Sequence, residues 1–152
     1  MWEDAANSSH LHGPGMLGNS YWTWEMSLPA AEQAPALARQ ATREVLASWR
    51  VTHLEETALL VVSELVTNAV RHAARGESVL ILRLEAAGIS LRIEVHDADP
   101  QRPQPGTPDG LDESGYGFVI IDALASKWGV SETATGKAVW AELDTRPGHQ
   151  PG

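Results

Sequence analysis

The chain has 152 residues, a formal net charge of -9 at pH 7 and 43% hydrophobic residues. That length suits one domain with a single core. No apolar run approaches the roughly 18 residues that a membrane-spanning helix needs, and the first residues lack the basic start and apolar block of a secretory signal. The absence of cysteine excludes disulfides, thiolate metal sites and cysteine nucleophiles. A cytoplasmic protein is the simplest interpretation.

The acidic balance narrows the choice of partners. The chain holds 20 Asp and Glu against 11 Lys and Arg, and the basic residues form no cluster. Nucleic acids and anionic membrane surfaces attract basic patches, so neither is expected as a partner. An acidic chain can still bind a polyanion where helix N-termini, glycine backbone or a divalent cation supply local positive potential.

Both ends of the chain differ in composition from its middle. Residues 1–20 are rich in Gly, Ser, Asn and His without periodicity, and residues 144–152 are rich in Pro and Gly. We therefore expect two flexible tails around one domain at 21–143. His10 and His12 fall in the first tail, where two histidines without further ligands are expected to be solvated.

The folded part begins with a strand and a helix. Residues 21–26 are aromatic and β-branched, which favours a strand. Pro29 and Pro35 each suit a helix entrance. A helix is expected from Ala36, because apolar residues recur every four positions. The resulting core-facing stripe consists of Leu37, Ala41, Val45 and Trp49.

A second helix is the best specified element. Thr52 and Glu55 match a capping box, which places the start of the helix near His53. Beside its apolar face lie Glu64 and Asn68, which are four residues apart and therefore share one face. Such a pair can offer a proton acceptor and a metal-binding oxygen to one pocket. Alternatively, both are solvated surface residues.

Two strands separated by a turn follow this helix. Residues 79–84 are almost continuously apolar, and Leu91, Ile93 and Val95 alternate with polar residues. The same alternation places Asp97 on the core-facing side, where an isolated carboxylate is costly and needs a hydrogen-bond partner. Alternatively, the strand has already ended and Asp97 caps a turn.

A long loop then leads into a third helix. Residues 98–114 contain four prolines and two glycines and cannot be regular structure. Gly115, Tyr116 and Gly117 precede a helix at 118–125. Glycines at a helix entrance let a phosphate approach backbone N–H groups where the helix dipole favours an anion.

The last elements are two strands, expected at 128–131 and 138–143 and joined by a turn. The full order is then β-α-α-β-β-loop-α-β-β. It predicts an α+β fold: a two-layer sandwich of a mostly antiparallel mixed sheet, covered on one face by three helices.

Three features occur in a fixed order along the chain. They are Glu64-Leu65-Val66-Thr67-Asn68-Ala69-Val70-Arg71-His72-Ala73 on a helix, Asp97 ending a strand, and Ser114-Gly115-Tyr116-Gly117-Phe118 opening a helix. Together they resemble the histidine-kinase-like ATPase superfamily. Within it, the chain is most similar to the small stand-alone members, the anti-sigma-factor serine/threonine kinases. The resemblance spans about residues 21–143.

The resemblance implies ATP and Mg²⁺ as cofactors. Asn68 would bind Mg²⁺ through its side-chain oxygen, and Glu64 would be the general base that activates the attacking hydroxyl. Asp97 would accept a hydrogen bond from the adenine amino group, and residues 98–114 would form a lid. The other nucleotide-binding residues implied by the resemblance are Gly115, Tyr116, Gly117, Phe118, Arg71 and Lys137, with the two glycines cradling phosphates.

The implied function is an ATP-dependent protein kinase that phosphorylates a small antagonist protein and sequesters a sigma factor. Kinases of this type are often dimers, so a homodimer is a further expectation. The alternative is a non-catalytic, partner-binding regulator with weak or no nucleotide binding.

The alternative is motivated by departures from the family pattern. The glycines that usually follow the aspartate motif are missing after Asp97, and Ala138 stands where a threonine is often found. The acidic residues of the expected lid are Asp99, Asp109, Asp112 and Glu113. A lid over a triphosphate is expected to bring positive charge, which Arg102 or Lys137 would have to supply.

Overall fold

The computed structural model describes residues 21–72, 79–97, 115–134 and 136–145. Its elements, in chain order, are β1 (Tyr21–Pro29), α2 (Ala34–Trp49), the 3-10 turn η1 (Thr52–Leu54), α3 (Glu55–His72), β2 (Val79–Ala87), β3 (Ser90–Asp97), α5 (Gly115–Leu124), β4 (Lys127–Thr133) and β5 (Gly136–Asp144). The expected tail at 1–20 and the expected loop at 98–114 lie outside the described residues. Of the second expected tail, Asp144 still belongs to β5.

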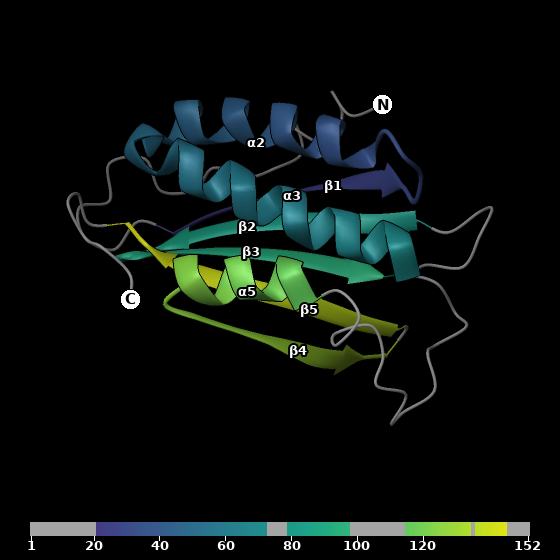
Figure 1. Ribbon diagram of the computed structural model, residues 1–152. Helices are drawn as coiled ribbons and strands as arrows, with labels where there is room; N and C mark the ends of the chain where they lie inside the picture. Colours follow the sequence, from purple (N-terminus) through teal and green to yellow (C-terminus); the bar gives the residue numbers. More distant parts are fainter. Residues whose placement is uncertain (1–20, 73–78, 98–114, 135, 146–152) are drawn as a thin grey trace.

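The strands form one sheet in the order β1-β2-β3-β5-β4, and each of its four pairings is antiparallel. Helices α2, α3 and α5 lie on one face of this sheet (Figure 1). The predicted α+β sandwich with three helices on one face is thus confirmed. The prediction of a mixed sheet is not, because the described strands contain no parallel pair.

Two details of the first strand and helix differ from expectation. Pro29 ends β1 instead of opening a helix, whereas Pro35 does lie in the first turn of α2. Leu37 is 41% exposed and is therefore not part of the core stripe. The inner face of α2 passes through its neighbour Ala38, about 100° further round the helix, which leaves Leu37 on the flank. The other predicted members of the stripe, Ala41, Val45 and Trp49, are buried.

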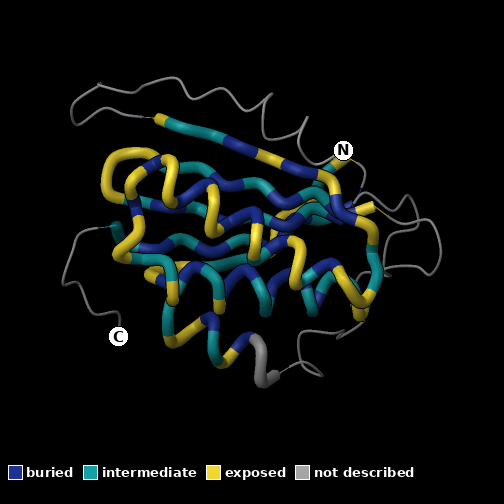
Figure 2. The backbone as a smooth tube through the Cα atoms, turned by 90° about the horizontal axis from the view of Figure 1, so that it is seen from above, coloured by how far each residue is buried: buried dark blue, intermediate teal, exposed yellow. Residues whose placement is uncertain are grey.

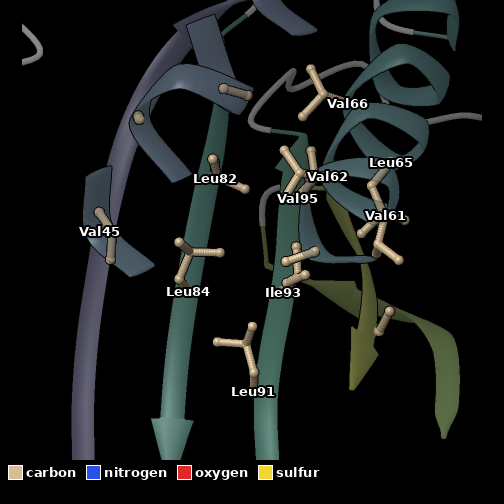
Figure 3. Close-up of a cluster of buried hydrophobic side chains, with 14 of the residues drawn as sticks. Val45, Val61, Val62, Leu65, Val66, Leu82, Leu84, Leu91, Ile93 and Val95 are labelled. Atoms are coloured by element: carbon tan, nitrogen blue, oxygen red, sulfur yellow. The ribbon is translucent and has the colours of Figure 1, made fainter. Parts of the chain in front are cut away.

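The core lies between the sheet and the helices. Buried side chains of α2 and α3 face alternate residues of β2 and β3 (Figure 3). Buried and exposed positions alternate along the strands, as β1 illustrates (Figure 2). Residues with an exposure of 1% or less include Val61, Val62, Leu65, Leu82, Leu84, Leu91 and Ile93. Burying this apolar surface contributes roughly 25 cal/mol per Å² and fixes the rotation of α3 against the sheet.

Helix α2 ends at a non-glycine residue with left-handed backbone. Arg50 has φ 62°, and the N–H groups of Arg50 and Val51 donate to the carbonyls of Ala47 and Leu46. A residue with a Cβ pays about 1–2 kcal/mol in this conformation, part of which the extra freedom of an unfolded glycine would offset. We expect Arg50→Gly to raise the free energy of unfolding by about 0.5–1 kcal/mol in urea denaturation.

The control for this substitution is Arg43→Gly in the middle of α2. Glycine inside a helix should lower the free energy of unfolding by about 1 kcal/mol. A loss of stability in Arg50→Gly would contradict the prediction.

Helix α3 starts two residues after the start predicted at His53. Thr52–Leu54 form a 3-10 turn, and α3 begins at Glu55. Glu55 and Glu56 then occupy the first turn, where acidic side chains suit the positive end of the helix dipole. The ring Nε2 of His53 hydrogen-bonds the carbonyl oxygen of Thr145, which ties this turn to the residue that follows β5.

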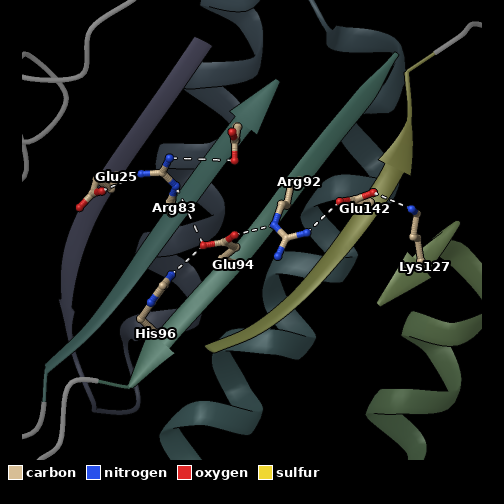
Figure 4. A network of polar contacts seen from close by, with 8 residues as sticks. Glu25, Arg83, Arg92, Glu94, His96, Lys127 and Glu142 are labelled. Atoms are coloured by element: carbon tan, nitrogen blue, oxygen red, sulfur yellow. Dashed lines mark hydrogen bonds and ion pairs between the residues drawn. The ribbon is translucent and has the colours of Figure 1, made fainter. Parts of the chain in front are cut away.

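The sheet face away from the helices carries a row of alternating charges. Across the sheet, the row consists of Glu25, Arg83, Glu94, Arg92, Glu142 and Lys127 (Figure 4). Arg92 is its centre: Nε lies 2.5 Å from Glu94, and Nη1 lies 2.8 Å from Glu142. The guanidinium carbon of Arg92 also lies 4.1 Å from the centre of the Trp140 ring. The contacts of Arg92 with Glu142 and Trp140 join β3 to β5 and stabilise the sheet, whereas the contact with Glu94 lies within β3.

The carboxyl group of Glu94 in this row has a lowered pKa. A 2.7 Å hydrogen bond from His96, followed by the hydrogen bond and charge of Arg92, lowers the pKa of Glu94 to about 2 against the opposing effect of burial. Because the pKa in the folded state is lower than the ordinary 4.5, the ionised carboxylate stabilises the fold above about pH 4.5. We expect about 1–2 kcal/mol after screening by solvent, lost as the pH falls from about 4.5 toward 2.

Urea denaturation of the wild type and of Glu94→Gln, near pH 7 and near pH 3, checks this prediction. The difference in stability should shrink by more than half at the lower pH. Glu25→Gln, which removes a carboxylate at the exposed end of the same row, should cost less than about 0.5 kcal/mol at both pH values. A Glu94→Gln difference of equal size at both pH values would exclude the assignment.

Candidate nucleotide site

Four elements end or begin at one edge of the molecule. The C-terminal half of α3, the end of β3, the start of β5 and the start of α5 lie there together (Figure 1). The packing agrees with this view, because α3 contacts α5, β3 and β5, and β3 pairs with β5. Residues that are far apart in the sequence are thereby brought to a common site.

Helix α3 contributes Glu64 and Asn68. Both lie inside one continuous helix, so their side chains project from the same face one turn apart. Asn68 is only 7% exposed, whereas Glu64 is half-buried. The alternative in which both are solvated surface residues is therefore wrong for Asn68. Buried carboxamides are uncommon and require hydrogen-bonding partners.

Strand β3 contributes Asp97. The strand continues through Asp97, which pairs with Leu80 on β2 and with Lys137 on β5. Asp97 is 8% exposed and shares the helix-facing side of the sheet with Val95 and Ile93. The prediction of a core-facing carboxylate is confirmed, and the alternative that the strand has already ended is wrong.

Strand β5 places Lys137, not Ala138, beside Asp97. Lys137 lies directly opposite Asp97 and is half-buried. Ala138 is opposite His96 and so faces the other side of the sheet. Ala138, which stands where a threonine is often found, is therefore not on the same face of the sheet as the carboxylate of Asp97. Having alanine in place of threonine at this position does not change the side chains on the helix-facing side of the site.

Helix α5 is held against β4 by contacts with Trp128. The rings of Phe118 and Trp128 lie 4.9 Å apart between centroids, and Trp128 Nε1 donates to Asp122 Oδ1 at 2.9 Å. This pair of contacts anchors the helix that Gly115 opens. Sequence reasoning missed the Asp122–Trp128 contact, because no motif or periodicity links a helix residue to a residue of the next strand.

The remaining predicted site residues are placed as follows. Phe118 is buried in the core, and its role in nucleotide binding stays a prediction. Gly115, Tyr116 and Gly117 form the first turn of α5, and Arg71 is exposed in the last turn of α3. Their contacts with a nucleotide also stay predictions.

The described donor set fits a magnesium ion that arrives with phosphate. Within residues 21–72, 79–97, 115–134 and 136–145, no group of three or more His, Asp or Glu could hold a metal ion. Mg²⁺ prefers oxygen ligands and is commonly held by one or two protein groups while phosphates and water supply the rest. The buried carboxamide oxygen of Asn68 is a ligand of that kind.

A separate apolar hollow lies between β1 and α2. Its volume is about 220 Å³, and its lining residues are Met26, Ser27, Leu28, Pro29, Leu37, Gln40 and Ala41. None of the predicted site residues lines it. The hollow therefore does not coincide with the polar site at the end of α3.

Comparison with known proteins agrees with this geometry. Residues 28–143 match the family model of the histidine kinase-like ATPase domain. The chain is also 31% identical over 87 residues to the uncharacterized protein SCO4941 of Streptomyces coelicolor, which covers 56% of this chain and 83% of that protein. Because the family model spans most of the chain, the protein belongs to the histidine kinase-like ATPase family. The resemblance noted in the sequence is confirmed.

Family membership indicates the ligand of the protein. The protein is an ATP-binding protein of a family that usually binds ATP with Mg²⁺. The buried carboxylate of Asp97 and the buried carboxamide of Asn68 have the chemistry that this ligand requires. Among the described helices, none combines the length and apolar content needed to cross a membrane.

Proposed function

We propose that the protein is an ATP-dependent serine/threonine protein kinase that phosphorylates a small antagonist protein and sequesters a sigma factor in the cytoplasm. The observation that carries the proposal is the buried Asn68 one helical turn from the half-buried Glu64, on a helix that packs against the strand ending in the buried Asp97. The family match and the motif phrases shared with anti-sigma-factor kinases support it.

Each residue has a role that follows from its chemistry. Asp97 accepts a hydrogen bond from the amino group of the base, and Asn68 offers its carboxamide oxygen to the cation. The first turn of α5 presents backbone N–H groups to phosphate. Glu64 accepts the proton of the attacking hydroxyl group. Mg²⁺ bound with ATP supplies neutralisation of phosphate charge, and the protein contributes mainly positioning.

The experiment is a phosphotransfer assay. The purified protein is incubated with Mg²⁺, ATP labelled at the γ-phosphate and, in turn, each small anti-sigma-factor antagonist protein of the same cell. Labelling of one antagonist on serine or threonine is expected. No labelling of any antagonist, under conditions where calorimetry shows ATP binding, would exclude the kinase.

The second candidate is a non-catalytic regulator that holds a partner protein and binds nucleotide weakly. The charge of residues 98–114, which lie outside the described residues, favours it: four acidic residues stand against Arg102. Calorimetry separates the candidates at little cost, because Mg-ATP binding that requires Asp97 would argue against the regulator. Light scattering of the same sample tests the proposed homodimer.

A further inference from the structure

A lysine, Lys137, lies beside Asp97, the carboxylate that we propose binds the nucleobase. Asp97 and Lys137 are direct partners in the antiparallel pairing of β3 with β5. Such partners project to the same side of a sheet, with Cβ atoms about 4.5–5.5 Å apart. That side faces the helices, because Lys137 lies on the same face of β5 as the buried Val139 and Ala141. The ammonium group is therefore within reach of a base held by Asp97.

The two purines present different groups to such a pair. On adenine, the amino group donates to the carboxylate, while the neighbouring N1 accepts and can take a hydrogen bond from the ammonium or from a water molecule. On guanine, N1–H and the 2-amino group donate while O6 accepts. Asp97 can accept both donors, but O6 would then lie beside a carboxylate without a donor, which is costly in a buried site. The ammonium of Lys137 supplies that donor and offsets the negative charge.

We propose that Asp97 and Lys137 together bind the nucleobase and accept guanine as well as adenine, so that the site binds GTP as well as ATP. This inference rests on the proposed nucleotide site and deepens it. Lys137 then acts on the base, whereas the sequence alone offered it as a source of positive charge for the triphosphate.

Titration calorimetry with Mg-ATP, Mg-GTP and Mg-tripolyphosphate tests the inference. The wild type should bind GTP with a Kd within about tenfold of that for ATP. Lys137→Met should weaken GTP binding by about tenfold or more, because a charge-assisted hydrogen bond to O6 is lost. ATP binding should change by less than about threefold, because a water molecule can replace the ammonium at adenine N1. Tripolyphosphate binding should not change, because Lys137 does not contact phosphate.

Lys127→Met is the matched control. Lys127 is 69% exposed and lies 3.9 Å from Glu142 on the open face of the same sheet, so the variant makes the same change of charge away from the site. It should leave all three affinities unchanged. Lys137→Gln keeps a hydrogen-bond donor but loses the positive charge, so its GTP affinity should lie between those of the wild type and of Lys137→Met. This second variant keeps the test valid if Lys137→Met folds poorly.

Three outcomes would overturn the inference. The first is a preference of the wild type for ATP over GTP of more than tenfold, which leaves the proposed kinase standing. The second is an equal loss of ATP, GTP and tripolyphosphate binding in Lys137→Met, which would place the ammonium on the phosphates. The third is a protein that binds none of the three probes, which would overturn the proposed function as well.

Discussion

Replacing Glu64 with glutamine should lower the rate of phosphotransfer by about 10²–10⁴-fold and change the affinity for ATP by less than about threefold. Glutamine keeps the size of the side chain and its half-buried position on α3 but cannot accept the proton of the attacking hydroxyl. The rate is measured as transfer of labelled phosphate to the antagonist protein, and the affinity by calorimetry. A variant that transfers phosphate at the wild-type rate would remove Glu64 from catalysis.

Glu56→Gln is the control for this variant. Glu56 is exposed in the first turn of α3, two turns before Glu64, so the same chemical change is made in the same helix away from the site. It should leave both rate and affinity within about twofold of the wild type. An equal loss of phosphotransfer rate in both variants would indicate damage to the helix instead of loss of the general base.

Replacing Asp97 with asparagine should weaken nucleotide binding by about 10–100-fold. A hydrogen bond to a charged acceptor contributes about 1.5–3 kcal/mol, and the amide of asparagine offers a neutral acceptor in its place. Asp97 is 8% exposed at the end of β3, where it is paired on both sides, so the isosteric change should preserve the strand. Calorimetry with Mg-ATP gives the affinity, and thermal unfolding confirms the fold.

Asp122→Asn is the matched control for this second variant. Asp122 lies on the exposed side of α5 and accepts the hydrogen bond of the Trp128 indole, which an asparagine oxygen can also accept. Its affinity for ATP should equal that of the wild type. If the Kd of Asp97→Asn for ATP lies within about threefold of that of the wild type, Asp97 does not bind the nucleobase.

Together, the two variants separate the candidate functions. A kinase loses rate in Glu64→Gln and affinity in Asp97→Asn, because one residue acts on the reacting hydroxyl and the other on the base. A regulator with optional nucleotide would show no transfer even in the wild type. The binding measurements on Asp97→Asn can be made without the partner protein.

The local features of the fold could be predicted because backbone periodicity creates them. Spacing by four along a helix put Glu64 and Asn68 on one face, and alternation along a strand put Asp97 in phase with Val95. The same reasoning was wrong for Leu37, because a stripe drawn at intervals of four drifts around a helix of 3.6 residues per turn and leaves the buried face.

Contacts between elements could not be predicted in this way. The ring contact of Phe118 with Trp128 and the Asp122–Trp128 hydrogen bond depend on how α5 packs on the sheet. The ion pair of Arg92 with Glu142 likewise needs the strand order, because β3 and β5 are distant in the chain. Such contacts arise from packing of whole surfaces, which no short window of sequence contains.

The sequence by itself determined the parts of the site that one element carries: the Glu64 and Asn68 face of a helix, the inward carboxylate of Asp97 and the glycines that open α5. Only the tertiary structure decided that Lys137 stands opposite Asp97 and that Ala138 faces away. The physical reason is register. A shift of one residue in the pairing of β3 with β5 would exchange those two side chains between the faces of the sheet, and the register is chosen by burial along both strands together.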